Sequence, residues 1–300
     1  MNFTLRQLRF LTAVAETLNF SRAAEICFVT QPTLSAGIKE LEERLGVRLI
    51  ERTKRHVMLT PVGEEIAGRA TALLLAAKEI GEAAAAHLRP DEGDLRLGAI
   101  PTIGPFLIPP ALPLLHGAFP NLRFYLREEM TEGLIAGLNE GRLDLILIAL
   151  PFEIGALEYE ALFEDGYHLA VPHGWGAGAG THFADSGQLM LLERGHCLQR
   201  HALSAFPDRD LRQDESFAAT SLATLIAMVS EGLGITLLPD LAVDAGVVAR
   251  GEVALTPLPD ACPRQVVLAW RKTSARAEVF RRIAGFLRET RRGLGATARG

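Results

Sequence analysis

The first sixty residues limit the fold most strongly, because apolar residues recur there at the spacing of short helices. Residues 5–18 have apolar side chains at helical spacing, and a break follows at residues 19–21. Residues 22–27 predict a second, short helix. A third helix is predicted over residues 31–45, since a proline such as Pro32 is tolerated in the first turn of a helix.

The third helix has one apolar face and one polar face. The apolar residues follow one another at helical intervals and predict a buried stripe. They are Leu34, Ile38, Leu41 and Leu45. The other face carries polar side chains that can meet base edges and phosphates. These are Gln31, Thr33, Ser35 and Lys39.

Residues 49–59 follow this helix and predict a two-stranded hairpin with a basic tip. Three short helices and a basic hairpin are typical of a winged helix-turn-helix, in which the third helix enters the major groove of DNA. Residues 1–60 contain nine Lys or Arg against six Asp or Glu, a net charge of +3, whereas the whole chain has −5. A basic N-terminal module on an acidic body favours DNA binding; a small helical bundle without this function is the alternative.

Residues 5–63 resemble the DNA-binding domain of LysR-type transcriptional regulators, through the motifs FSRAAE, QPTLS, IKELEERLGV, LIERT and LTPVG. The resemblance implies roles for seven side chains. Gln31, Pro32 and Thr33 would enter the major groove, Ser35 and Lys39 would hold the DNA backbone, and Arg52 and Arg55 would serve the wing. Cys27 is interpreted as a core residue of the second helix.

Residues 61–90 predict one long helix, which links two domains. Ile66, Leu73 and Ile80 repeat every seven residues, and Ala70, Ala77 and Ala84 form a second line, which together indicate close packing along a partner helix. In the family that the chain resembles, this linker helix forms the homodimer. We therefore expect a DNA-binding domain over 1–60, a linker over 61–90 and an effector domain over 91–300.

The effector domain alternates between strands and helices in its first part. Residues 95–100, 123–129 and 143–150 predict strands, and residues 106–119 and 131–140 predict helices. This alternation predicts an α/β fold with a parallel sheet, helices on both faces, and ligands at the carboxyl ends of the strands. Thr102 and Thr131 follow two of these strands.

A second set of short elements follows, with strands expected at 167–171, 189–192, 217–219, 235–239 and 265–270 and helices near 198–206 and 221–231. A helix over 276–292 would end the fold, followed by a disordered tail. We expect a first lobe of about 93–165 plus 270–300 and a second of about 166–269. Such a pair of lobes resembles the periplasmic-binding-protein-like effector domain of the same family.

Cys197 lies in the segment LMLLERGHCLQRHALSAF, where an apolar run ends and a helix is expected to begin. Arg194, His196, Arg200 and His201 surround it. Cationic neighbours and a helix N-terminus both favour the thiolate, which is the form of cysteine that reacts with oxidants. The alternative is a half-buried cysteine with no chemical role.

Four segments resemble the peroxide-sensing members of the LysR-type family: IPTIGPFLIPP, LDLILIAL, LMLLERGHCL and SLATLIAMVSEGLGITLLP. The resemblance implies that hydrogen peroxide oxidises Cys197 and that Thr102, Thr131, His196 and Arg271 surround the peroxide. These members carry a second cysteine nine residues after the first, where this chain has Phe206. Oxidation would then stop at a sulfenic acid or a mixed disulfide, or use the distant Cys262, or peroxide sensing would be lost.

Three functions are compatible with these patterns. The leading hypothesis is a one-cysteine, peroxide-responsive regulator that binds promoter DNA. The second is a LysR-type regulator that binds a small metabolite between its lobes. The third is a thiol enzyme using Cys197 and His196, which leaves residues 1–63 unexplained, so we expect no enzymatic activity. The resemblance further implies a homotetramer, and contact with RNA polymerase if the protein activates transcription.

Cysteine usage and hydropathy set the expected compartment. The three cysteines are scattered, odd in number and without metal-ligand spacing, which fits a reducing cytoplasm and predicts no metal and no cofactor. No apolar run approaches the length of a membrane span, and no signal peptide pattern is present. We therefore expect a cytoplasmic protein without a membrane partner.

Overall fold

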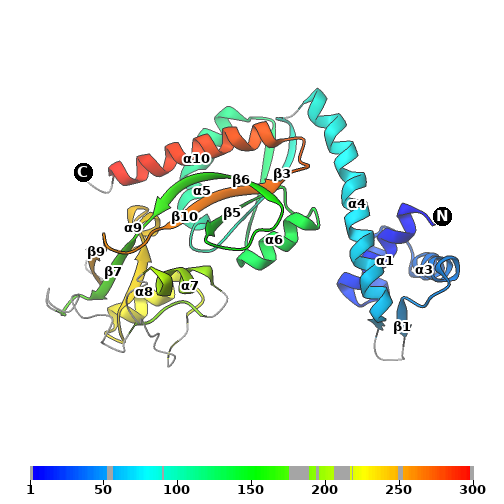
Figure 1. Ribbon diagram of the computed structural model, residues 1–300, viewed down its shortest axis with the longest axis horizontal. Helices are drawn as coiled ribbons and strands as arrows, with labels where there is room; N and C mark the ends of the chain where they lie inside the picture. The colour runs from blue at the N-terminus through cyan, green and yellow to red at the C-terminus, as the bar shows by residue number, and fades with distance from the viewer. Residues whose placement is uncertain are drawn as a thin grey trace. The chain divides into compact units, whose positions relative to one another are not determined.

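The computed structural model describes residues 3–52, 57–89, 91–175, 189–193, 196–205, 217, 219–248 and 253–297. The chain divides into two compact units, Met1–His87 and Leu88–Gly300. Figure 1 shows the elements of both units, which are described in turn.

The first unit is a winged helix-turn-helix followed by a long helix, as the sequence predicts. Its elements are α1 (Leu5–Thr17), α2 (Phe20–Ile26), α3 (Gln31–Leu45), the wing strands β1 (Ile50–Arg52) and β2 (Val57–Leu59), and α4 (Pro61–Leu88). Side-chain caps begin the three short helices: Thr4, Asn19 and Thr30 each accept a hydrogen bond from a backbone N–H of the first turn.

The core of this unit forms where α3 packs on α1. Of the predicted stripe, Leu34, Ile38 and Leu41 are fully buried, whereas Leu45 at the end of the helix is half-buried. A Cβ atom at Gly37 would lie 2.6 Å from the Phe10 ring, so glycine at this position permits the close approach of the two helices. The local sequence pattern therefore fixes both the helices and their contact.

The first lobe of the second unit is built on a five-stranded sheet in the order β4-β3-β5-β10-β6. The strands are β3 (Gly93–Ala99), β4 (Leu122–Glu128), β5 (Leu145–Leu150), β6 (Leu157–Asp165) and β10 (Arg264–Arg271). Strand β3 pairs in parallel with β4 and β5, whereas β10 is antiparallel to β5 and β6. The expected α/β fold is confirmed, but the sheet is mixed, because β10 returns from the second lobe in the opposite direction.

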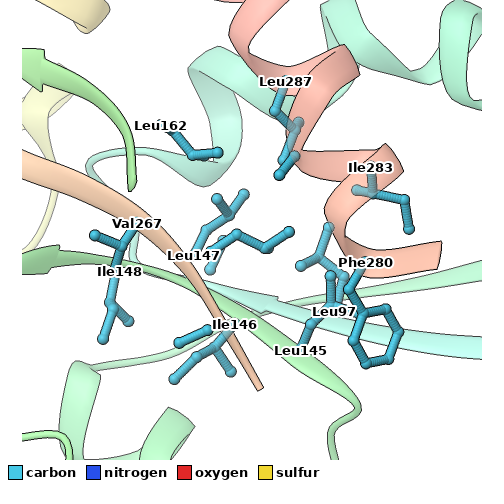
Figure 2. Close-up of a cluster of buried hydrophobic side chains, with 14 of the residues drawn as sticks. Leu97, Leu145, Ile146, Leu147, Ile148, Leu162, Val267, Phe280, Ile283 and Leu287 are labelled. Atoms are coloured by element: carbon cyan, nitrogen blue, oxygen red, sulfur yellow. The ribbon is translucent and has the colours of Figure 1, made fainter. Parts of the chain in front are cut away.

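Helices cover both faces of this sheet. Helices α5 (Gly104–Ala118) and α10 (Ala277–Thr297) lie on one face, and α6 (Thr131–Asn139) lies on the other (Figure 1). Side chains of β5 alternate between the faces, and Figure 2 shows Leu145 and Leu147 with Phe280, Ile283 and Leu287 of α10. Residues 145–149 of β5 are all completely buried, as expected for a central strand covered on both faces.

The second lobe contains a three-stranded antiparallel sheet in the order β8-β7-β9. Its elements are β7 (Tyr167–Pro172), α7 (Cys197–Ser204), α8 (Leu222–Ser230), β8 (Thr236–Pro239), α9 (Asp240–Asp244) and β9 (Val253–Pro257). The strands expected at 189–192 and 217–219 are reduced to single parallel bridges, Leu189 to Ile235 and Leu192 to Ala219.

The boundary between the lobes and the end of the chain differ from the sequence expectations. Strand β10 joins the first sheet at Arg264, so the second lobe ends before this residue instead of at residue 269. Helix α10 continues to Thr297, into the tail expected to be disordered, because Leu294 packs against the first lobe's core. Within the described ranges, no helix is long and apolar enough to cross a membrane.

The central position of β5 predicts a large stability loss when a side chain is removed from it. We expect Leu147→Ala to lower the free energy of unfolding by about 2–5 kcal/mol, because the side chain is fully buried and its loss leaves a cavity. The matched control Leu126→Ala lies on edge strand β4 with the leucine 46% exposed, so we expect a change within about 0.5 kcal/mol. Urea unfolding followed by tryptophan fluorescence measures both; equal losses would contradict this description of the core.

Candidate functional site

The first unit presents the predicted DNA-contacting residues on α3. Gln31, Pro32, Thr33 and Lys39 are exposed, and Ser35 is half-buried. The Ser21 hydroxyl donates a hydrogen bond to Oε1 of Gln31 over 3.2 Å, which orients the amide at the start of α3. Arg55 and the side chain of Arg52 lie outside the described residues.

The wing is fixed to α3 by one carboxylate. Oε1 of Glu42 accepts hydrogen bonds from the backbone N–H groups of Leu49 and Ile50, at 2.8 and 3.1 Å. Exposed Arg48 lines a hollow between α3 and β1 together with Ser35 and Lys39. Arg48 is a further cation on this face that the sequence reasoning missed, although its place in the basic segment after α3 could have indicated it.

The second unit contains a small pocket between its two lobes. The pocket encloses no more than about 180 Å³ and is lined by Ile100, Pro101, Thr102, Met130, Thr131, His196 and Leu198. Thr102 follows β3 and Thr131 begins α6, both in the first lobe, whereas His196 directly precedes α7 in the second lobe. Three of the predicted peroxide-contacting residues therefore line one pocket.

Two polar atoms in this pocket are buried without a hydrogen-bond partner in the described part of the chain. They are Oγ1 of Thr131 and Nε2 of His196. An unpaired buried polar group is unfavourable, so each atom is a position where a bound polar molecule would be stabilised. The pocket has no room for a water-sized molecule in this conformation, so a small ligand that donates and accepts hydrogen bonds here would displace part of the lining.

Arg264 holds Thr102, one of the residues that line the pocket. Its Nη1 donates to Oγ1 of Thr102 at 2.9 Å, which leaves the hydroxyl proton of Thr102 able to donate elsewhere. Its Nε and Nη2 donate to Oδ2 of Asp165 at 3.0 and 2.8 Å, and Oδ1 of Asp165 accepts from the N–H of Leu241. Burial raises the pKa of Asp165, while the Arg264 guanidinium and the Leu241 amide act against this rise.

Arg271, which the family resemblance places near the peroxide, is not among the residues that line the pocket. Its Nη1 donates to the carbonyl groups of Leu138 and Leu143, at the far end of α6 from Thr131. Arg264 and Arg271 stand at opposite ends of β10. The start of this strand was expected in the second lobe, and Arg264 is therefore not among the site residues predicted from the sequence.

Both histidines next to Cys197 have lowered pKa values. Burial lowers the pKa of His196, with Glu193 acting in the opposite direction. Burial also lowers the pKa of His201, whose Nε2 lies 2.9 Å from the carbonyl oxygen of Pro151. A neutral imidazole of His201 donates to this carbonyl, and a neutral His196 offers the pocket either a donor or an acceptor.

Cys197 is the first residue of α7. It lies in the chain between His196 and Leu198, which both line the pocket. The side chain of Cys197 lies outside the described residues. The helix begins where the sequence analysis expected it.

The other two cysteines differ in their surroundings. Cys27 is half-buried between α1 and α2, and burial raises its pKa, which disfavours the thiolate. Cys262 is exposed, and its backbone N–H donates to the carbonyl oxygen of Ala205 at 2.8 Å. Over the described ranges, no group of three His, Cys, Asp or Glu side chains could hold a metal ion.

Two family models match nearly the whole chain. Residues 5–64 match the bacterial regulatory helix-turn-helix protein of the lysR family, and residues 89–292 match the LysR substrate binding domain.

The chain is similar to transcriptional regulators that include EstR and OxyR. The chain is 37% identical to the HTH-type transcriptional regulator EstR of Acinetobacter baylyi, over 95% of this chain and 96% of that protein. It is 38% identical to the DNA-binding transcriptional dual regulator OxyR of Escherichia coli, over 95% and 94%.

Among solved structures, a full-length OxyR variant of Pseudomonas aeruginosa matches with a TM-score of 0.77 and 36% identity, over 96% of this chain and 98% of that one. A Corynebacterium glutamicum OxyR variant with hydrogen peroxide bound matches with a TM-score of 0.63 and 29% identity, over 99% and 95%.

The lowered pKa of His201 predicts a loss of stability in acid. An unfolded chain takes up the proton near the ordinary pKa of about 6.5, before the folded chain does, so protonation favours unfolding below that pH. We expect the free energy of unfolding to fall between pH 7.5 and 5.5, and His201→Gln to reduce this dependence. Urea unfolding at both pH values measures it, with His116→Gln, at an exposed position, as control. An unchanged pH dependence in His201→Gln would count against the buried neutral imidazole.

Proposed function

Because the chain belongs to the LysR family of bacterial helix-turn-helix regulators, we propose that it binds promoter DNA in the cytoplasm and responds to hydrogen peroxide through Cys197. One observation carries the proposal: a small pocket lies at the N-terminus of the helix that Cys197 begins, and two of its buried polar atoms have no hydrogen-bond partner among the described residues.

The polar groups of the pocket match the hydrogen-bonding needs of a peroxide. Hydrogen peroxide has two donors and two accepting oxygens, and the pocket offers the unpaired Thr131 hydroxyl, the His196 imidazole and the Thr102 hydroxyl held by Arg264. A peroxide, which has only two heavy atoms, needs a smaller displacement of the pocket's lining than a metabolite, which is the alternative effector for this family. We assign Arg271 a structural role, because it donates a hydrogen bond to a carbonyl group near the end of α6, and no contact with the peroxide.

The proposed reaction is a transfer of one oxygen to sulfur. The thiolate of Cys197 attacks one peroxide oxygen, the O–O bond breaks, and Cys197 becomes a sulfenic acid. The departing hydroxide takes up a proton and leaves as water. The hydroxyl groups of Thr102 and Thr131 and the imidazole of His196 stabilise the charge that develops on the departing oxygen.

The names of relatives support this signal. OxyR proteins and hydrogen peroxide-inducible genes activators recur among the similar proteins, and one similar structure contains hydrogen peroxide. EstR has comparable identity, so similarity alone does not single out the signal. The pocket supplies the additional argument.

Promoter recognition is assigned to α3 and the wing, and dimerisation to α4. Leu73 is 43% exposed and Ile80 is 74% exposed on α4, an apolar line that a second copy of the helix would cover. Pairs of such dimers would form a homotetramer. Contact with RNA polymerase would follow if the protein activates transcription.

Removal of one pocket hydroxyl should slow the oxidation of Cys197. We expect Thr131→Val to lower the rate of sulfenic acid formation by at least about tenfold, because a donor to the departing oxygen is lost. The measurement is stopped-time trapping with a sulfenate-specific reagent and mass spectrometry, with Thr12→Val in α1 as a control that should retain the wild-type rate. A wild-type Cys197 that reacts no faster than exposed Cys262 would end the peroxide proposal.

The two classes of proposed DNA contact should have different effects on binding. Gln31→Ala and Thr33→Ala should lower discrimination between a selected site and the same fragment scrambled, whereas Lys39→Ala and Arg52→Ala should weaken binding to both about equally. Loss of one phosphate contact should also reduce the slope of log K against log salt by about 1. Dissociation constants at two salt concentrations measure this; identical specificity ratios in all four variants would contradict the assignment.

A further inference from the structure

The fold brings the second cysteine of the effector domain to the end of the helix that the first one begins. The segment 91–300 contains two cysteines, Cys197 and Cys262. Helix α7 starts at Cys197 and is capped at its C-terminus by Ala205. The carbonyl oxygen of Ala205 accepts a hydrogen bond from the backbone N–H of Cys262 at 2.8 Å. The side chain of Cys262 is exposed and therefore accessible for reaction.

We propose that Cys262 is the resolving thiol for Cys197, and that their disulfide forms with the unwinding of α7. The inference rests on the proposed peroxide chemistry at Cys197. The reaction is the resolution of the Cys197 sulfenic acid. The family resemblance implies a second cysteine for it at the position of Phe206, which is one residue after Ala205.

Helical geometry couples the disulfide to a change in shape. Cys197–Ser204 is an eight-residue helix, which separates its ends by about 10 Å at 1.5 Å per residue. A disulfide requires Cα atoms within about 7 Å of each other. An unwound segment of this length reaches up to about 25 Å and can fold back on itself, so Cys197 can approach Cys262 once part of α7 unwinds.

Helix α7 is suited to local unwinding because it is only eight residues long, although Leu198 and Ala202 pack in the core of the second lobe. Isolated helices below about 12 residues are only marginally stable in water, so α7 depends on its packing. Two of its contacts reach the segment after β5 in the first lobe: His201 donates to the Pro151 carbonyl, and the Arg200 guanidinium lies 4.6 Å from the centre of the Phe152 ring. Unwinding would release both contacts, and with them a connection between the lobes.

Formation of the disulfide needs no further oxidant, because the peroxide has already oxidised Cys197 to the sulfenic acid. The Cys262 thiolate attacks the sulfur of the Cys197 sulfenic acid, the S–O bond breaks, and the S–S bond forms. The hydroxide that leaves combines with the proton released by the Cys262 thiol, giving water. One peroxide thus oxidises two thiols and yields two molecules of water.

The test uses the reduced full-length protein and one equivalent of hydrogen peroxide, with rapid alkylation and peptide mass spectrometry without reductant. We expect a peptide cross-linked between Cys197 and Cys262. In Cys262→Ser we expect no cross-link and a trapped Cys197 sulfenic acid that persists at least tenfold longer. Cys27→Ser is the matched control and should behave like the wild type, since Cys27 lies in the other unit. Because Cys262 is exposed, the Cys262→Ser protein should retain the wild-type melting temperature.

Hydrogen exchange of residues 197–205 provides the conformational readout. Peroxide should raise exchange there in the wild type and in Cys27→Ser, but not in Cys262→Ser. Equal sulfenic acid lifetimes in wild type and Cys262→Ser, without a cross-linked peptide, would overturn the inference and leave the peroxide proposal intact. A cross-link only between chains would also overturn it. Failure to form a sulfenic acid in any variant would overturn both proposals.

Discussion

The buried ion pair between Arg264 and Asp165 is the interaction on which the pocket between the lobes depends. Asp165 is the last residue of β6 and Arg264 the first of β10, and the two are paired across the sheet. These are the two points where the chain passes between the lobes. Both side chains are completely buried, and Arg264 continues to Thr102 at the end of β3. The same guanidinium therefore fixes the two crossings and one wall of the pocket.

Such a pair is a poor source of stability but a strong geometric constraint. Taking two charges out of water costs several kcal/mol for each, and loss of one partner from a buried pair costs about 3–5 kcal/mol because the other charge remains. Three donors satisfy Asp165: Nε and Nη2 of Arg264 and the amide of Leu241 at the start of α9. The pair holds three elements in one arrangement, which a pair of apolar residues would do less specifically.

Local signals in the sequence predicted much of the fold and part of the site. The stripe on α3, the proline at its start and the apolar run of β5 each reflect short-range rules, and they identified those elements. Thr102 and Thr131 could be predicted because side chains at the carboxyl ends of neighbouring strands meet at one edge. The choice between Arg264 and Arg271 depended on where β10 enters the sheet. Edge strand β6 and the contacts of α7 likewise arise from pairings far apart in the chain, which no local pattern encodes.

The placement of α7 explains how chemistry at one atom can affect two lobes. Central strand β5 is buried on both faces. Helix α7 has only eight residues, a length at which a helix depends on its packing for stability. Its N-terminus lines the pocket through His196 and Leu198, and its middle contacts Pro151 and Phe152, which follow the end of β5 beside the start of β10. A change in α7 therefore removes one wall of the pocket and two connections between the lobes in a single step. Under the proposed chemistry, a cysteine at the start of this helix couples its oxidation to that change, whereas a cysteine on β5 would lie in a strand that is buried on both faces.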